Sequence, residues 1–136
     1  MLVVDASAVA ELLLVRAAGT VVARHLADHD FDLHAPQLLD IEVLSALRRI
    51  VASGEASAER AGEAISDLLD LPIERYSHEP FVPRVWQLRD NFSAYDATYL
   101  ALAETLAASP IPLLTADARF ARAMETHAEV PVILVG

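Results

Sequence analysis

The segment LVVDASAVAELLLV, residues 2–15, decides the fold that the rest of the chain completes. Its first residues, Leu2 to Val4, are a short apolar and β-branched run that predicts a strand. Helical spacing of apolar residues over 6–15 predicts a helix that follows at once, with Ser7 as its N-cap. Asp5 stands between the two. A strand that runs directly into a helix is the building unit of an α/β fold.

Strand and helix patterns alternate along the whole sequence. Short apolar runs predict strands over residues 2–4, 32–35, 73–76, 113–115 and 132–135. Helical spacing, with its start and stop signals, predicts helices over residues 6–15, 20–27, 37–52, 56–71, 80–90, 94–108 and 118–126. Continuously apolar strands indicate a parallel sheet that is covered on both faces. We therefore expect an α/β fold, with one domain over residues 1–136.

The composition excludes several kinds of chemistry. The chain has no Cys, and all ten of its basic residues are Arg because no Lys occurs. Thiolate nucleophiles, Cys-type zinc sites, Schiff-base chemistry and a Lys-containing phosphate loop are therefore ruled out. The net charge of −10 argues against a nucleic-acid partner, unless several acids gather around divalent cations that offset their charge.

The chain is rather apolar, with a mean hydropathy of +0.36. Two explanations stay open: a surface that a second copy or another protein covers, or a dense core of Ala and Leu. Asp5 and Glu11 interrupt the apolar start, and no basic residue precedes it. We therefore expect neither a secretory signal nor a membrane span, and we expect a cytoplasmic protein.

Three carboxylates occupy the ends of predicted elements. Asp5 ends the first strand, Asp117 lies two residues past the fourth strand, and Asp96 falls in the first turn of its helix. In parallel sheets, ligands bind beyond the carboxyl ends of the strands, so we expect Asp5 and Asp117 to lie near the same sheet edge. The helix dipole favours an anion at the position of Asp96.

Glu42 belongs to the same set for a different reason. Its helix neighbours three and four residues away are Leu38, Leu39, Ser45 and Ala46, which form a mostly apolar or small face. A carboxylate on such a face needs a donor or a cation, and several converging acids favour a divalent metal ion. Oxygen ligands alone indicate Mg²⁺ or Mn²⁺ over zinc or copper.

Each acid also has a structural explanation. Ser93 and Asp96 fit a capping box, Asp117 fits an N-cap, Asp5 fits a turn and Glu42 fits a solvated helix position. The case for a site depends on all four together, since independent caps have no reason to converge.

The sequence resembles the PIN-domain nucleases, and within them the VapC-type toxins. Four segments in order carry the resemblance: VVDASA (3–8), PQLLDIEVLSALRR (36–49), NFSAYDATYLALAE (91–104) and LLTADARFARA (113–123). It implies a three-layer α/β/α domain with a five-stranded parallel sheet of order 3-2-1-4-5. It also implies a homodimer, dependence on Mg²⁺ or Mn²⁺, endoribonuclease activity as a toxin, and an antitoxin partner.

The resemblance also assigns roles to residues. Asp5 and Asp96 match the central metal ligands, and Glu42 and Asp117 match the remaining catalytic acids. Ser7 and Thr115 stand where the family often has a supporting hydroxyl. An antitoxin could inhibit the nuclease by placing a cationic side chain among these acids.

Other residues are weighed for binding roles. Candidate contacts to RNA phosphates are Arg48, Arg49, Arg119 and Arg122. His25 and His29 have the spacing of a helical zinc pair but no third ligand, so a solvated helix end is the better explanation. Core or interface positions, not base-stacking ones, are expected for Trp86, Tyr95, Tyr99 and Phe120.

Two rival functions remain for comparison. A phosphatase or phospho-accepting domain built on Asp5 needs a Lys, which is absent, and the phosphatase usually has a second acid where Ser7 stands. A PIN-like module that binds RNA or protein without cleaving it is the alternative from a different class, and the complete set of acids argues against it.

Overall fold

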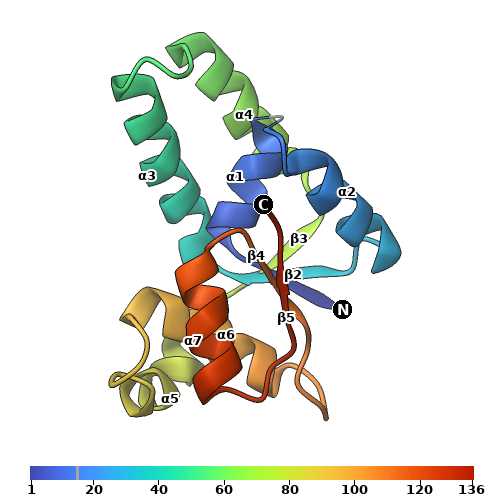
Figure 1. The fold of residues 1–136 in the computed structure, drawn as a ribbon, viewed down its shortest axis with the longest axis vertical. Helices are drawn as coiled ribbons and strands as arrows, with labels where there is room; N and C mark the ends of the chain where they lie inside the picture. Colours follow the sequence, from blue (N-terminus) through green and yellow to red (C-terminus); the bar gives the residue numbers. More distant parts are fainter. Residues whose placement is uncertain (15) are drawn as a thin grey trace.

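A computed structural model describes residues 1–14 and 16–136. Its centre is a parallel sheet of five strands in the order β3-β2-β1-β4-β5, which confirms the expected fold class and strand order (Figure 1). The strands are β1 (Leu2–Val4), β2 (Leu33–Pro36), β3 (Ile73–Tyr76), β4 (Leu113–Thr115) and β5 (Val132–Leu134).

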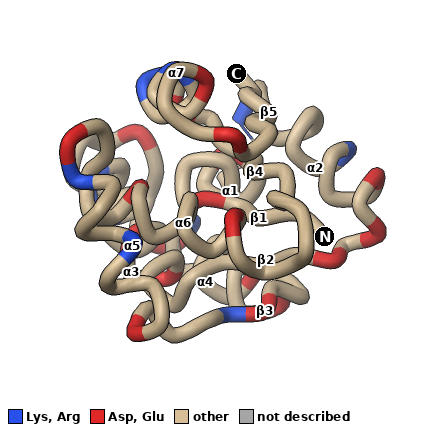
Figure 2. Tube along the Cα trace, turned by 90° about the horizontal axis from the view of Figure 1, so that it is seen from below, with Lys and Arg blue, Asp and Glu red and all other residues tan. Residues whose placement is uncertain are grey.

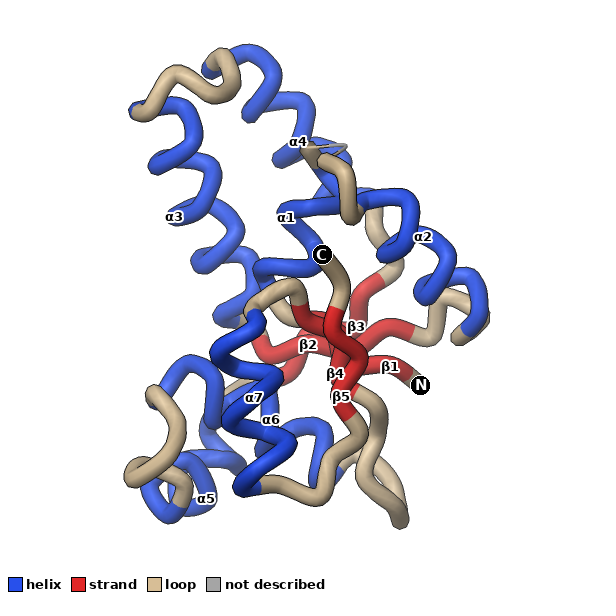
Figure 3. Tube along the Cα trace, viewed as in Figure 1, coloured by secondary structure: helices blue, strands red, loops and turns tan. Residues whose placement is uncertain are grey.

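Helices cover both faces of the sheet. They are α1 (Ala6–Leu13), α2 (Gly19–Asp28), α3 (Leu38–Ala52), α4 (Ala58–Asp70), α5 (Val82–Gln87), α6 (Ala94–Thr105) and α7 (Ala118–His127), with a 3₁₀ turn at Glu79–Phe81. Figure 3 shows α1 to α4 on one side of the sheet and α5 to α7 on the other, and α3 with α4 extends beyond the sheet. None of the helices in the described part of the chain is long and apolar enough to cross a membrane.

The core consists of the central strands and helix α6. All residues of β1 and β4 are buried, as continuously apolar strands between two helix layers require. Helix α6 is buried on every side from Ala97 to Ala103, so it forms the middle of its layer. Each fully buried Leu or Val of this kind stabilises the fold by about 1.5–3 kcal/mol. The first turn of α6 is thereby held rigidly beside the sheet edge.

The structure corrects the start of the first helix. Its N-cap is Asp5, whose carboxylate accepts a hydrogen bond from the N–H of Ala8, and not Ser7. Asp5 is the N-cap because its backbone is extended where the strand ends, which is the conformation that an N-cap residue needs. The helix ends at Leu13, and residue 15, where its end was predicted, lies outside the described residues.

Other element boundaries differ by a few residues. The helix predicted over 80–90 is a 3₁₀ turn followed by a short α-helix that ends at Gln87. The predicted helix over 94–108 ends at Thr105, and β2 includes Pro36 as its last residue. Pro36 can stand there because a strand end tolerates a missing N–H donor.

Candidate functional site

The four predicted acids come from four different elements. Asp5 caps α1 at the end of β1, and Asp117 caps α7 two residues after β4. Strands β1 and β4 are hydrogen-bonded neighbours, so both caps lie at the same edge of the sheet. Asp96 lies in the first turn of α6, and Glu42 lies on α3. We call these four residues the acid site.

Asp5 is the most constrained of the four. It is buried, and its Oδ1 accepts hydrogen bonds from Ser7 Oγ at 2.7 Å and from the Ala8 N–H at 3.0 Å. Its Oδ2 accepts a short hydrogen bond from Thr115 Oγ1. The hydroxyls of Ser7 and Thr115 in turn accept the N–H groups of Ala116 at 2.9 Å and Asp117 at 3.0 Å. Both predicted supporting hydroxyls therefore contact Asp5, and their role in catalysis stays a prediction.

The remaining acids are progressively more open. Glu42 is half-buried on α3, and its Oε1 accepts a hydrogen bond from the hydroxyl of Tyr99 at 2.7 Å. Asp117 is exposed, and its Oδ1 accepts the N–H groups of Arg119 at 2.9 Å and Phe120 at 3.2 Å. Asp96 is half-buried next to them. The site therefore has a buried end at Asp5 and an open end at Asp117.

The carboxylates of the acid site affect one another electrostatically. Burial and, to a smaller extent, the charge of Asp117 raise the pKa of Asp5 to about 6, against the hydrogen bonds from Thr115, Ser7 and Ala8 that lower it. Burial also raises the pKa of Asp96 to about 6, followed by repulsion from Asp117 and Asp5. The pKa of Glu42 is raised by burial and by Asp96, while the hydrogen bond from Tyr99 opposes this. The convergence expected from the strand ends is therefore present.

The donor types fit a hard divalent cation, since all four side chains offer carboxylate oxygens. The arrangement does not yet form a coordination shell. Within residues 1–14 and 16–136, no group of three or more His, Asp or Glu side chains is close enough to hold a metal ion. The carboxylates of Asp5, Glu42 and Asp117 also accept hydrogen bonds from protein donors, which compete with an ion. A carboxylate has about four acceptor positions, so capacity for an ion remains.

Two open clefts reach the acid site. One of about 340 Å³ is lined by Asp96, Asp117, Arg119 and residues around Phe92. The other, of about 300 Å³, is lined by Ile41, Glu42, Ser45, Arg49 and Tyr95. Solvent and a substrate can therefore approach the acids from two sides.

Of each pair of candidate arginines, Arg48 with Arg49 and Arg119 with Arg122, only one lines a cleft of the acid site. Arg119 and Arg49 line a cleft together with an acid. Arg48 instead lines a hollow between α3 and α4, and Arg122 lines neither cleft of the acid site. Successive helix residues point about 100° apart, so the adjacent Arg48 and Arg49 lie on different surfaces of α3. Figure 2 shows the acidic segments spread over the chain, with basic segments on α7 among others.

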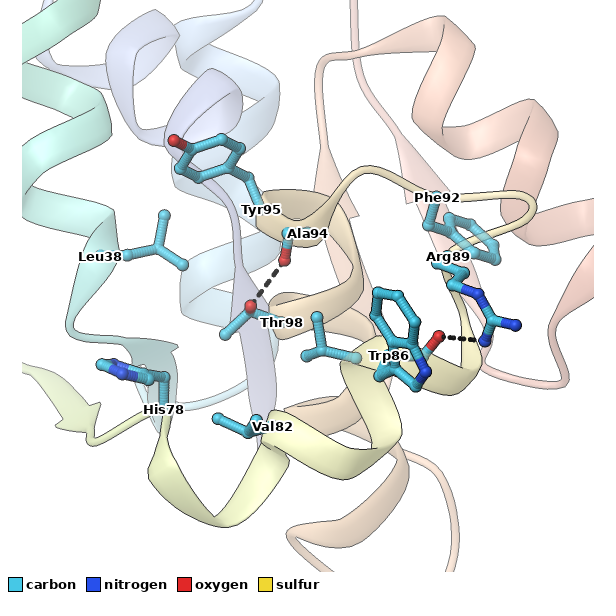
Figure 4. A pocket seen from close by; sticks show the side chains of 10 residues that line it. Leu38, His78, Val82, Trp86, Arg89, Phe92, Ala94, Tyr95 and Thr98 are labelled. Carbon is cyan, nitrogen blue, oxygen red and sulfur yellow. Dashed lines mark hydrogen bonds between the residues drawn. The ribbon is translucent and has the colours of Figure 1, made fainter.

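A further cleft of about 510 Å³, which none of these acids lines, lies between α5 and the starts of α3 and α6 (Figure 4). We call it the apolar cleft; its lining includes Leu38, Val82, Val85, Trp86 and Tyr95. Trp86 and Tyr95 are 67% and 63% exposed, so neither is a core residue, and an interface position stays a prediction for both; Tyr99 and Phe120 are core residues, as expected. Helix α5 has six residues, none of which is buried, so Trp86 lies at the surface.

One contact of the site had no sequence prediction. Tyr99, expected only as a core or interface residue, hydrogen-bonds Glu42. It follows Asp96 by three residues, the spacing that puts two helical side chains on one face. That spacing was visible in the sequence, but the partner on α3 was not. Of the His25 and His29 pair, His29 Nδ1 lies 2.8 Å from the carbonyl oxygen of His25 at the end of α2.

Known proteins resemble this chain over nearly its whole length. The profile of the PIN domain matches residues 2–125. Ribonuclease VapC1 of Mycobacterium tuberculosis is 43% identical over 132 residues, which is 96% of both chains. Ribonuclease VapC12 of the same organism is 38% identical over 133 residues, covering 98% of this chain and 99% of the relative. The fold also matches the crystal structure of PAE2754 from Pyrobaculum aerophilum, with a TM-score of 0.67, 20% identity, and coverage of 96% of this chain and 81% of that one.

Proposed function

Because this chain belongs to the PIN-domain family, and within it to the VapC ribonucleases, we propose that it is a toxin that cleaves RNA with the help of Mg²⁺ or Mn²⁺. The observation that carries the metal-dependent step is the acid site. Asp5 and Asp96 come from distant parts of the chain, and both have a pKa raised to about 6 by burial and by neighbouring acids. Repulsion of this kind is relieved when a divalent cation binds between the carboxylates.

The acids have distinct roles in this proposal. Asp5 and Asp96 would be the central ligands of the ion, and Glu42 and Asp117 would supply the remaining carboxylates around it. When bound, the ion polarises the scissile phosphate and lowers the pKa of an attacking water. Ser7 and Thr115 keep the carboxylate of Asp5 in one orientation through their hydrogen bonds.

The arginines beside the clefts bind the phosphate backbone. Arg119 stands at the open end with Asp117, and Arg49 stands beside Glu42. Neither guanidinium forms an ion pair within the described part of the chain, so both are available for phosphates. Arg48 and Arg122 contribute more distant positive charge. No protein nucleophile is needed, which suits a chain without Cys or Lys.

The apolar cleft supports a homodimer. Its exposed neighbours Ile41, Val82, Trp86 and Tyr95 form an apolar surface, each at least 55% exposed. A contiguous surface of this kind indicates a protein partner. We infer that a second copy covers it and that an antitoxin binds elsewhere, inserting a cationic side chain among the acids. We propose that the protein acts in the cytoplasm, where an RNA substrate would be available to it.

One observation favours the alternative, a PIN-like module that binds RNA or protein without cleaving it. Protein donors already satisfy part of Asp5, Glu42 and Asp117, and the described residues show no group of three metal-binding side chains. Such a module would keep the fold and the arginines but would have no use for an ion.

A cleavage assay separates the two functions. Purified protein is incubated with labelled single-stranded and hairpin RNAs in Mg²⁺, Mn²⁺ or EDTA, beside Asp5→Asn, Asp96→Asn and the surface control Asp70→Asn. We expect cleavage that needs the ion, that is lost in the first two variants and that is unchanged in the control. RNA binding without cleavage under every metal condition would instead support the module.

A further inference from the structure

We propose that Tyr99 is a positioning residue of the acid site, whose hydroxyl holds Glu42 in the orientation that serves the divalent cation. This inference rests on the proposed function, because it gives Glu42 a task only if the acids bind an ion.

The geometry links two helices at one point. Tyr99 on α6 donates a hydrogen bond of 2.7 Å to Glu42 Oε1 on α3. The tyrosine is 1% exposed, so its ring is fixed by the surrounding core, whereas Glu42 is only half-buried. Tyr99 also lies one helical turn after Asp96, on the same face of α6. The buried tyrosine therefore holds the more exposed glutamate toward the face of α6 that carries Asp96.

The hydrogen bond matters because a glutamate side chain has several rotatable bonds. A half-exposed glutamate without a partner samples many rotamers, and binding an ion would have to fix one of them. With Oε1 held by Tyr99, the side chain is ordered in advance. Its Oε2 has no hydrogen-bond partner in the described residues, so it is the atom left for an ion or its water. Hydrogen bonds from outside the ligand set orient metal ligands in this way in other metalloproteins.

A purely structural role is the competing explanation. A buried tyrosine hydroxyl needs an acceptor in any protein, and Glu42 supplies one. Both explanations predict some change in stability when the hydroxyl is removed. Only the positioning role predicts a change in ion affinity that depends on Glu42.

Tyr99→Phe removes the hydroxyl and keeps the ring in the core. Tyr76→Phe is the matched control, because it removes a hydroxyl that lies 2.8 Å from His34 Nδ1, away from the acid site. Mn²⁺ affinity of each purified protein is measured by calorimetry and by the loss of the free-ion electron paramagnetic resonance signal. We expect Tyr99→Phe to weaken Mn²⁺ binding by about 10- to 100-fold and Tyr76→Phe to leave it within about twofold.

Glu42 variants test the same link from the other side. Glu42→Asp keeps a carboxylate and leaves the core intact, but its side chain is one methylene too short for the hydrogen bond with Tyr99. We therefore expect it to weaken Mn²⁺ binding as Tyr99→Phe does. This variant keeps the test available if Tyr99→Phe folds poorly. On a Glu42→Gln background, Tyr99→Phe should cause no further loss. Wild-type Mn²⁺ affinity in Tyr99→Phe or in Glu42→Asp would overturn the inference. So would a loss of Mn²⁺ affinity from Tyr99→Phe that is as large on the Glu42→Gln background as in the wild type. If wild-type protein and Asp96→Asn bind Mn²⁺ equally weakly, the proposed function fails and the inference with it.

Discussion

Replacing Asp5 with Asn should stabilise the metal-free protein at neutral pH, although it destroys the proposed ion site. The fold holds Asp5 buried with a pKa of about 6, against an ordinary value of 3.8. That difference corresponds to about 3 kcal/mol at neutral pH, using 1.36 kcal/mol for each tenfold change in proton affinity. Asn keeps an acceptor for the Ala8 N–H, and its amide can donate to Thr115, so we expect a net gain of about 1 to 3 kcal/mol.

The sign depends on pH in a defined way. Below about pH 4 both the folded and the unfolded chains carry the proton on Asp5, and ionisation has no effect on stability. As the pH rises from 4 to 6, the unfolded chain loses this proton first, so the folded state of the wild type becomes less stable. Above pH 6 the loss is complete. The advantage of Asp5→Asn should therefore be small at pH 4 and fully developed at pH 7.5.

Urea unfolding at pH 4, 6 and 7.5, with EDTA and then with Mn²⁺, measures this effect. Asp32→Asn is the control of opposite sign, because His34 holds the pKa of Asp32 below its usual value through a 2.7 Å hydrogen bond. With Mn²⁺ at pH 7.5 the order should reverse, since the ion stabilises only the carboxylate form. Equal pH dependence of the wild type and Asp5→Asn in EDTA would refute the reasoning, because ionised Asp5 would then carry no penalty.

Three further predictions concern the surface and the packing. Arg119→Ala should weaken RNA binding and lower the slope of log affinity against log salt concentration by about 1, while Arg122→Ala changes it less. Trp86→Glu should convert the proposed homodimer into a monomer, as measured by light scattering, without unfolding it. Gly19→Ala should lower the free energy of unfolding by about 1–3 kcal/mol, because its methyl group would lie 2.8 Å from the carbonyl oxygen of Glu11; a calorimetric melt that matches wild type would contradict this.

The sequence predicted the sheet because β1 and β4 are short, mostly apolar runs that alternate with helical patterns, whereas β3 carries Glu74 and Arg75 and gives a weaker signal. Strand order was a different matter, since nothing in the spacing of the strands fixes which are neighbours, and the resemblance supplied it. Convergence of Asp5 and Asp117 could be predicted, because parallel strands end at one edge. The cap of α1 could not be decided, because Asp5 and Ser7 are both good caps and the choice depends on where the strand ends.

The contact between Tyr99 and Glu42 shows the limit of local reasoning. The two residues are 57 positions apart, and their meeting depends on how α3 and α6 pack, which no local pattern encodes. The same applies to Trp86 and Tyr95. The sequence places an aromatic residue of a helix in the core or at an interface, and only the packing of α5, which carries Trp86, and of the first turn of α6, which carries Tyr95, shows both side chains to be exposed.

Stability and function oppose each other at Asp5. A buried, ionised carboxylate weakens the fold at neutral pH, so this position is explained better by what binds there than by the stability of the chain alone. In the proposed function, a divalent ion and a cationic side chain from an antitoxin would relieve the same repulsion, so the two would compete for the site. If the antitoxin acts in this way, raising the Mn²⁺ concentration should weaken its binding, and Asp5→Asn should remove that dependence on Mn²⁺.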